Sequence, residues 1–220
     1  MASTTVTETL SFRPREVGAT LRVIYALEPV AAAVGLVLAM PVMVVLAAWV
    51  AVLARRSPLV RHHRIGWRGE PLPMLKVRTM WSRDAVPGPI FTIEDVCDYI
   101  PEAKHVSDPR VTSRFAAWCR RYSLDELPQL YHVMRGEMSI VGPRPITHAE
   151  LETHYGPSMR EVLSLRPGLV GLWQVMGRNH LTYARRRRLD LLLVRRASAT
   201  LYFRILVRAI YKVFCGHGAY

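Results

Sequence analysis

The sequence predicts a mostly helical α+β protein, in which an N-terminal membrane helix precedes a compact membrane-surface domain with amphipathic interfacial helices. Three observations support this fold class. Residues 30–54 contain no charged side chain. Residues 201–213 carry basic and apolar side chains at helical spacing. A strand-like segment near residue 77 lies among loops rich in glycine and proline.

The composition limits the class of protein. Hydrophobic residues make up 50% of the 220 residues, which excludes a disordered, collagen-like or low-complexity chain. The three cysteines form no CxxC pair, so neither a zinc knuckle nor a disulfide framework is predicted. The net charge of +13 favours partners that carry phosphate, which are nucleic acid, anionic lipid or nucleotides.

The first two predicted units are a mobile tail over residues 1–22, rich in serine and threonine, and a membrane helix over residues 23–56. A helix over the 25 uncharged residues 30–54 would extend about 37 Å, beyond the ~30 Å hydrocarbon core of a bilayer. We therefore expect this segment to insert into a membrane. Pro41 removes a backbone hydrogen bond from its middle and predicts a kink.

Arginines flank the apolar segment on both sides and bear on its topology. They are Arg13, Arg15 and Arg22 before it and Arg55, Arg56, Arg61 and Arg64 after it. Because short basic flanks prefer the cytoplasm, a helix that bends at Pro41 and leaves the leaflet that it entered satisfies both flanks. A kinked helix that crosses the bilayer fits equally well, because nearby glutamates weaken the N-terminal asymmetry. These residues alone leave both topologies open.

Residues 57–220 form the third predicted unit, a single folded domain. In its first part the sequence predicts a turn at 57–58, a loop at 65–69, a strand or turn ending at 80, and loops with a short helix over 81–110. A helix over 113–121 and a helix ending near 134 follow, and then an irregular stretch over 143–167. A long helical pattern then runs from Arg185 to Phe214. Arg204, Arg208 and Lys212 are spaced four apart and form one basic stripe along this pattern. Either the helix lies in the headgroup layer of a membrane, or it packs on a soluble core with the stripe in water.

Two adjacent carboxylates, Asp125 and Glu126, follow a pair of arginines in residues 120–130. Ser123 and Glu126 have the spacing of a capping box, and acids favour a first helical turn, so a helix start is one interpretation. A binding or catalytic site is the other. The surrounding arginines favour the site.

Three arginines lie in loops that proline or glycine stiffens. Arg144 stands between two prolines, Arg166 precedes Pro-Gly and Arg178 follows a glycine. Rigid arginines suit bidentate contacts to phosphate. Three such loops together with one acidic pair favour a phosphate-binding site over a simple helix start.

These stretches resemble the bacterial sugar transferase family, the monotopic phosphoglycosyl transferases that begin glycan assembly on undecaprenyl phosphate. The resemblance rests mainly on residues 123–130, 135–145 and 166–178 and covers about 23–220 in order. It implies a re-entrant membrane helix and a catalytic domain on the cytoplasmic face of the bacterial inner membrane. The implied reaction, the first membrane step of polysaccharide synthesis, transfers a sugar 1-phosphate from a UDP-sugar to undecaprenyl phosphate and releases UMP.

The resemblance also implies roles for single residues. Asp125 would be the nucleophile that forms a phosphosugar-aspartyl intermediate, Glu126 its partner, and the two would bind Mg²⁺. The implied ligands of the substrate phosphates are Arg120, Lys76, Arg144, Arg166 and Arg178. A carboxylate can attack phosphorus once metal and arginines neutralise the phosphate oxygens. Neighbouring arginines are expected to keep Asp125 ionised.

The alternative function is a non-catalytic basic membrane adaptor that binds anionic lipid or nucleic acid. Residues 185–188 form a run of arginines, but no groove-reading motif accompanies them, and no HExxH, GxSxG or P-loop motif occurs. We therefore expect a UDP-sugar, undecaprenyl phosphate and an anionic bilayer surface as partners, and no nucleic acid. The sequence leaves open the identity of the sugar and whether the chain is a monomer or a homodimer.

Overall fold

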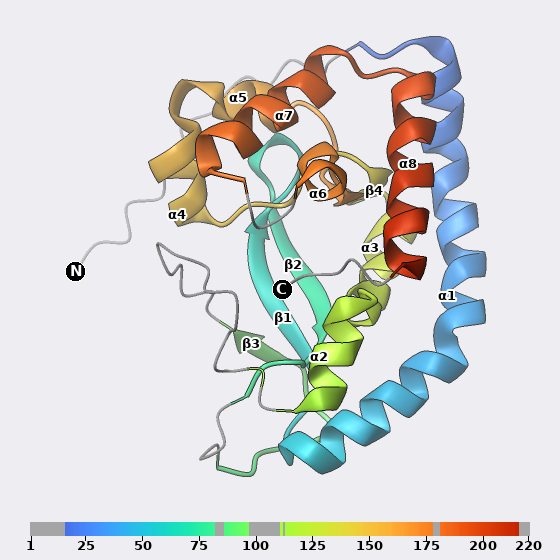
Figure 1. Cartoon of the computed structure of the whole chain (residues 1–220), viewed down its shortest axis with the longest axis vertical. Coiled ribbons are helices and arrows are strands. Elements are labelled where there is room, and N and C mark those ends of the chain that lie inside the picture. The colour runs from blue at the N-terminus through green and yellow to red at the C-terminus, as the bar shows by residue number, and fades with distance from the viewer. Residues whose placement is uncertain (1–15, 82–85, 97–110, 112, 178–180, 216–220) are drawn as a thin grey trace.

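A long helix packs along one side of a domain that contains both helices and strands (Figure 1). The computed structural model describes residues 16–81, 86–96, 111, 113–177 and 181–215. Within that part of the chain, the mostly helical α+β class is confirmed.

The N-terminal helix α1 (Ala19–Ala54) contains both Pro29 and Pro41. Figure 1 shows that α1 bends partway along its length, as a proline inside a helix explains. Its 36 residues are long and apolar enough to cross a membrane, and only 11% of its most apolar window is buried inside the protein. The rest of the described chain therefore leaves this apolar surface uncovered, unlike the core helix of a soluble protein.

A twisted hairpin occupies the centre of the domain. β1 (Leu59–Ile65) pairs antiparallel with β2 (Pro71–Val77), and β3 (Glu94–Val96) pairs parallel with the other edge of β1. The short 3-10 helix η1 (Trp67–Gly69) connects the first two strands. No strand was predicted at β1, which was wrong, because four consecutive basic residues at 61–64 hide the apolar alternation of a strand.

Short helices then lead to a second, smaller sheet. α2 (Arg114–Arg121) confirms the helix predicted over 113–121, and the Ser113 hydroxyl caps it by accepting the Ala116 amide at 3.0 Å. The 3-10 helix η2 (Leu124–Gln129) continues into α3 (Leu130–Met134). β4 (Ser139–Val141) pairs parallel with β5 (Gly168–Val170).

The stretch between β4 and β5, predicted to be irregular, is largely helical. It contains α4 (His148–Glu150), a π-helical turn η3 (Leu151–Tyr155), a 3-10 turn η4 (Gly156–Ser158) and α5 (Met159–Val162). Pro143 and Pro145 precede α4, Pro157 lies at the start of η4 and Pro167 follows α5. At these places proline does not interrupt a helix.

The C-terminal region forms α6 (Leu172–Met176), α7 (Tyr183–Arg195) and α8 (Ala199–Phe214). The continuous helical pattern predicted from 185 to 214 was therefore wrong at 196–198. There Ser198 starts α8 as its N-cap, with its hydroxyl accepting the Leu201 amide at 3.3 Å, as serine favours in that position. Tyr202, Ile205 and Ala209 of α8 are buried.

The largest core cluster joins α1 to the second sheet and to α6, α7 and α8. Glu28 of α1 is buried within this region, with 3% of its surface exposed. Its Oε1 accepts hydrogen bonds from the Ser139 hydroxyl at 2.7 Å, the Ile140 amide at 2.9 Å and the Tyr202 hydroxyl at 2.8 Å. One carboxylate oxygen thus connects the apolar helix to β4 and α8.

We expect Glu28→Leu to lower the free energy of unfolding by on the order of 2 kcal/mol or more, because two buried hydroxyls and a partly buried amide lose their acceptor. Glu28→Gln keeps an oxygen at this position and should lose much less. Thermal unfolding of the detergent-solubilised protein compares the two variants. Equal stability of Glu28→Leu and the unsubstituted protein would contradict this role.

Candidate functional site

The two adjacent carboxylates lie on η2, directly after a sharp turn of the backbone. Ser123 adopts the left-handed conformation with φ of 57°, and its side chain makes no cap hydrogen bond. The capping-box interpretation of Ser123 and Glu126 is therefore wrong. A left-handed non-glycine residue costs roughly 1–3 kcal/mol and is common at functional sites. This turn passes the chain from α2 into η2 and buries Asp125, which is 7% exposed.

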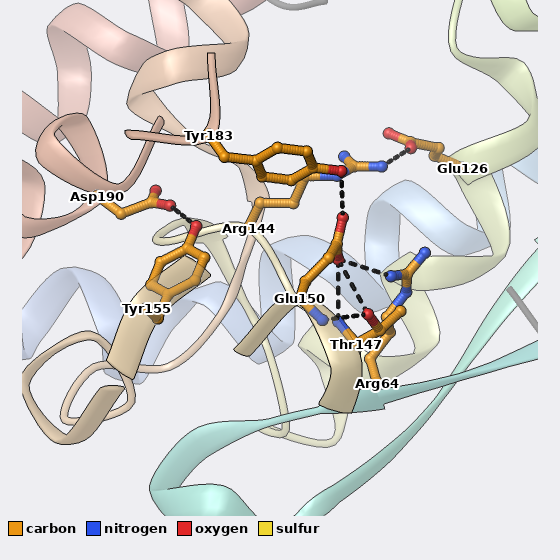
Figure 2. A network of polar contacts seen from close by, with 8 residues as sticks. All are labelled: Arg64, Glu126, Arg144, Thr147, Glu150, Tyr155, Tyr183 and Asp190. Carbon is orange, nitrogen blue, oxygen red and sulfur yellow. Dashed lines mark hydrogen bonds and ion pairs between the residues drawn. The ribbon is translucent and has the colours of Figure 1, made fainter. Parts of the chain in front are cut away.

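Two cationic side chains form ion pairs with Glu126. Its Oε1 lies 3.0 Å from Lys76 Nζ of β2 and 3.5 Å from Arg144 Nη2 in the loop after β4. Figure 2 shows the Arg144 guanidinium directed at Glu126. Burial alone would raise the pKa of Glu126, but Lys76 and Arg144 outweigh it and lower the pKa to about 2. Glu126 is therefore ionised.

Asp125 has a different environment from its neighbour. Burial raises the pKa of its carboxyl group, and the charge of Glu126 raises it further, although Lys76 and Arg120 act in the opposite direction. No described side chain forms a hydrogen bond or ion pair with the Asp125 carboxylate. The expectation that nearby arginines keep Asp125 ionised is thus not supported. Environments that separate the pKa values of two carboxyl groups are typical of sites that assign them different roles.

A buried histidine holds the strand that carries Lys76. His132 Nε2 accepts the backbone N–H of Leu75 at 3.2 Å, and Nδ1 lies 2.7 Å from Glu137 Oε2. Because Nε2 must be unprotonated to accept the amide, Nδ1 carries the proton and donates to Glu137. His132 and Glu137 therefore fix the backbone next to Lys76, through the hydrogen bond of His132 to the Leu75 amide. Sequence reasoning missed the roles of His132 and Glu137, although Glu137 belongs to a stretch quoted for the family resemblance.

Close contact between two backbones fixes the start of the Arg144 loop. A Cβ atom at Gly168 would lie 2.0 Å from the Gly142 nitrogen, and one at Gly142 would lie 2.4 Å from the Arg166 carbonyl oxygen. Only glycine permits such an approach, which is needed for β4 to pair with β5. The loop that carries Arg144 therefore begins from a rigid point.

A polar network fixes the other end of this loop (Figure 2). Thr147 and Glu150 form a capping box at the start of α4, in which the Thr147 amide donates to Glu150 Oε2 at 3.1 Å. The same carboxylate accepts from Arg64 of β1 at 3.3 Å and from the Tyr183 hydroxyl of α7 at 3.2 Å. Glu150 thus joins three segments next to the Arg144 loop, and sequence spacing did not reveal it because its partners are distant in the chain.

Three of the five predicted phosphate-binding cations gather at the dyad. Lys76 and Arg144 contact Glu126, and the charge of Arg120 acts on Asp125. Arg166 instead lies with its guanidinium carbon 5.2 Å from the centre of the Trp67 ring, and no contact found in the described chain joins it to the dyad. Arg178 lies outside the described residues. Phosphate binding by these residues stays a prediction.

The donor set at the dyad fits Mg²⁺ better than zinc. Within the described residues no group of three or more His, Cys, Asp or Glu side chains could hold a metal ion. Zinc sites need three or four such ligands. Mg²⁺ is usually held by one or two carboxylates together with substrate phosphates, and Asp125 and Glu126 offer that number.

A second buried carboxyl group lies close to the Arg144 loop, on α7. Asp190 is fully buried and its Oδ2 accepts the Tyr155 hydroxyl at 2.8 Å. Burial raises the pKa of Asp190 to about 7, against the lowering effects of the Tyr155 hydrogen bond and of Arg144. No role was predicted for Asp190 from the sequence, and the structure places it as a support behind the loop.

Comparison with known proteins agrees with the family resemblance seen in the sequence. The family model for bacterial sugar transferases matches residues 20–216. The exopolysaccharide production protein ExoY of Rhizobium meliloti is 39% identical over 193 residues, which cover 86% of this chain and 84% of that protein.

Two longer proteins match over about a third of their length. The undecaprenyl-phosphate galactose phosphotransferase of Salmonella typhimurium is 38% identical over 67% of this chain and 31% of its own length. The UDP-glucose:undecaprenyl-phosphate glucose-1-phosphate transferase of Klebsiella pneumoniae is 32% identical over 84% of this chain and 38% of its own length.

We expect His132→Leu to destabilise the protein by about 1–3 kcal/mol, since the partly buried Leu75 amide loses its buried acceptor. His132→Gln can place an oxygen near the former Nε2 and should recover part of this loss. Thermal unfolding of both variants measures the effect. A leucine variant as stable as the glutamine variant would show that the hydrogen bond to Leu75 contributes nothing.

The raised pKa of Asp190, about 7 against ~3.9 in an unfolded chain, predicts a pH dependence of stability. Between these values the folded protein binds a proton that the unfolded chain lacks, so stability falls as the pH rises and its loss is complete above the folded pKa. Relative to Asp190→Asn, the unsubstituted protein should gain up to about 1.4 kcal/mol per pH unit on acidification from pH 7 to 5.

Thermal midpoints of both proteins between pH 5 and 8 measure this difference. A stability difference that stays constant over this range would mean that Asp190 does not titrate there.

Proposed function

The chain belongs to the bacterial sugar transferase family, and we propose that it transfers a sugar 1-phosphate from a UDP-sugar to undecaprenyl phosphate and releases UMP. It is a phosphoglycosyl transferase, the activity for which its Salmonella and Klebsiella relatives are named. The observation that carries the proposal is the buried Asp125, which has no ion-pair partner among the described residues, beside the ion-paired Glu126. A non-catalytic adaptor gives no reason for this arrangement.

The proposed reaction has two displacements at one phosphorus atom. Mg²⁺ and the cations at the site would favour the ionised form of Asp125 when the substrate is bound. A carboxylate oxygen of Asp125 then attacks the sugar-proximal phosphorus of the UDP-sugar, and the bond to UMP breaks with the electron pair leaving on UMP. A phosphate oxygen of undecaprenyl phosphate then attacks the phosphosugar-aspartyl intermediate, and the Asp125 carboxylate leaves. A carboxylate without an ion pair is the better nucleophile of the two, because pairing stabilises the ground-state charge of Glu126.

The remaining residues at the site bind and orient the diphosphate. Lys76 and Arg144 contact Glu126, which supports a role for them in binding substrate phosphate oxygens at the dyad and in stabilising the charge that develops there. Arg120 adds a third cation on the side of Asp125. Mg²⁺ held by Asp125, Glu126 and the substrate phosphates would supply further charge neutralisation.

The long apolar helix indicates membrane association. We propose that α1 is re-entrant and that the domain lies on the cytoplasmic face of the bacterial inner membrane, with anionic lipid at its basic surface. The bend in α1 (Figure 1) and the arginines on both of its flanks support this topology. α8 also exposes large apolar side chains, such as Phe203 and Val207, as an interfacial helix requires.

Asp125→Asn should reduce transfer by at least about 10³-fold, while the protein remains folded in the membrane fraction. The assay measures release of UMP from a panel of UDP-sugars with undecaprenyl phosphate and Mg²⁺. Glu152→Gln, an exposed acid on η3, is the matched control and should keep full activity. Substantial turnover by Asp125→Asn would refute the nucleophile assignment.

The re-entrant topology predicts that a tag near residue 5 and a tag at the C-terminal end are both cytoplasmic. Accessibility to a membrane-impermeant reagent, measured in intact cells and after permeabilisation, locates the two tags. Labelling of the first tag from the periplasm would show that α1 crosses the bilayer.

A further inference from the structure

A row of four aromatic rings extends from the membrane helix to the turn before the dyad. Ring centroids are 5.8 Å apart for Trp49 and Phe115, 6.1 Å for Phe115 and Trp118, and 5.6 Å for Trp118 and Tyr122. Phe115 and Trp118 on α2 and Tyr122, the residue that ends this helix, are spaced three and four apart, so they lie on one face. We call Trp49, Phe115, Trp118 and Tyr122 the aromatic row.

The aromatic row is packed on one side and open on the other. Phe115 packs against the small core cluster of Val50, Ala54 and Val77. Trp49 and Trp118 nevertheless remain 56% and 48% exposed. Large apolar rings that the protein itself leaves uncovered, in a continuous line, are typical of a surface that receives an apolar partner.

The two ends of the row differ in chemistry. One end lies on the apolar part of α1. The other end, at Tyr122, is followed by the turn into η2, and the last turn of α2 there carries Arg120 and Arg121. The charge of Arg120 acts on Asp125, against the burial that raises the pKa of the Asp125 carboxyl group, and the guanidinium carbon of Arg121 lies 5.9 Å from the centre of the Tyr122 ring.

We propose that the aromatic row binds the isoprenoid chain of the polyprenyl phosphate acceptor and directs its phosphate to Arg120 and the dyad. This inference rests on the proposed function and adds the location of the acceptor. A long apolar chain with an anionic end matches a row that begins in the membrane and ends in positive charge. A UDP-sugar lacks such a chain, and bulk lipid gives no reason for the row to end at the dyad.

The packing of α2 against η2 supports the short distance that this path requires. The two elements are in direct contact. Burial, together with the charge of Asp125, raises the pKa of the Cys119 thiol on the inner side of α2. Tyr122, at the end of the row, precedes Asp125 by only three residues, so a chain lying along the row ends at the turn that leads into the dyad, where an acceptor phosphate must arrive.

The test compares acceptors of different chain length in detergent solution, with a UDP-sugar that the unsubstituted protein uses. Trp118→Ser should raise the KM for the long-chain polyprenyl phosphate at least about fivefold, while the KM for the UDP-sugar stays unchanged. With a short, water-soluble isoprenyl phosphate the variant should equal the unsubstituted protein. The preference for long chains is then reduced.

Phe203→Ser on α8 is the matched control, because Phe203 is an equally exposed aromatic residue at 52% on a helix that packs mainly on α1, α6 and the second sheet. It should leave both KM values unchanged. An unchanged acceptor KM in Trp118→Ser, or an equal change in Phe203→Ser, would overturn the inference in favour of general lipid contact.

Photo-crosslinking of the unsubstituted protein provides a test that needs no variant. A polyprenyl phosphate with a photoreactive group in its isoprenoid chain should label residues 114–122 or the segment around Trp49. Labelling confined to α8 or to other regions would overturn the inference while leaving the transfer reaction standing. Absence of UMP release with every UDP-sugar would instead refute the proposed function, and the inference with it.

Discussion

The ion pairs of Glu126 with Lys76 and Arg144 are the constraint on which the rest of the site depends. They bring a strand, a 3-10 helix and a loop from distant parts of the chain to one carboxylate oxygen. Removing either cation would leave a poorly compensated charge in a buried place. Because Glu126 takes the direct pairs, Asp125 has no ion-pair partner among the described residues, as its proposed role as nucleophile requires. The proposed division of roles between the two acids thus follows from which of them the cations reach.

Polar groups buried elsewhere hold this arrangement in position. His132 fixes the strand beside Lys76, Glu150 fixes the segment after Arg144, and Glu28 ties the apolar helix to β4. Each uses hydrogen bonds between segments that apolar packing alone would allow to slide. Directional bonds of this kind define one geometry when they are fully satisfied. The close approach of Gly142 and Gly168 adds a steric constraint of the same kind.

Local features of the fold could be predicted from the sequence, whereas long-range pairing could not. The uncharged segment predicted α1, and the helix predicted over 113–121 is α2. β1 could not be predicted because the partners of its basic residues lie on another strand: Arg61 and His63 lie beside Asp95 of β3. The acidic dyad was found as a pair of adjacent carboxylates, but only the folded hairpin shows that Lys76 reaches Glu126.

We propose that Asp125 is the residue that becomes bonded to phosphorus. Mass spectrometry can detect and locate this bond directly. The unsubstituted protein, incubated with a UDP-sugar that it uses but without polyprenyl phosphate, should gain the mass of the sugar 1-phosphate less one water. Fragmentation should place this mass on the peptide that contains Asp125, and addition of the acceptor should remove it. An adduct on another residue, or UMP formation without any adduct, would contradict the account.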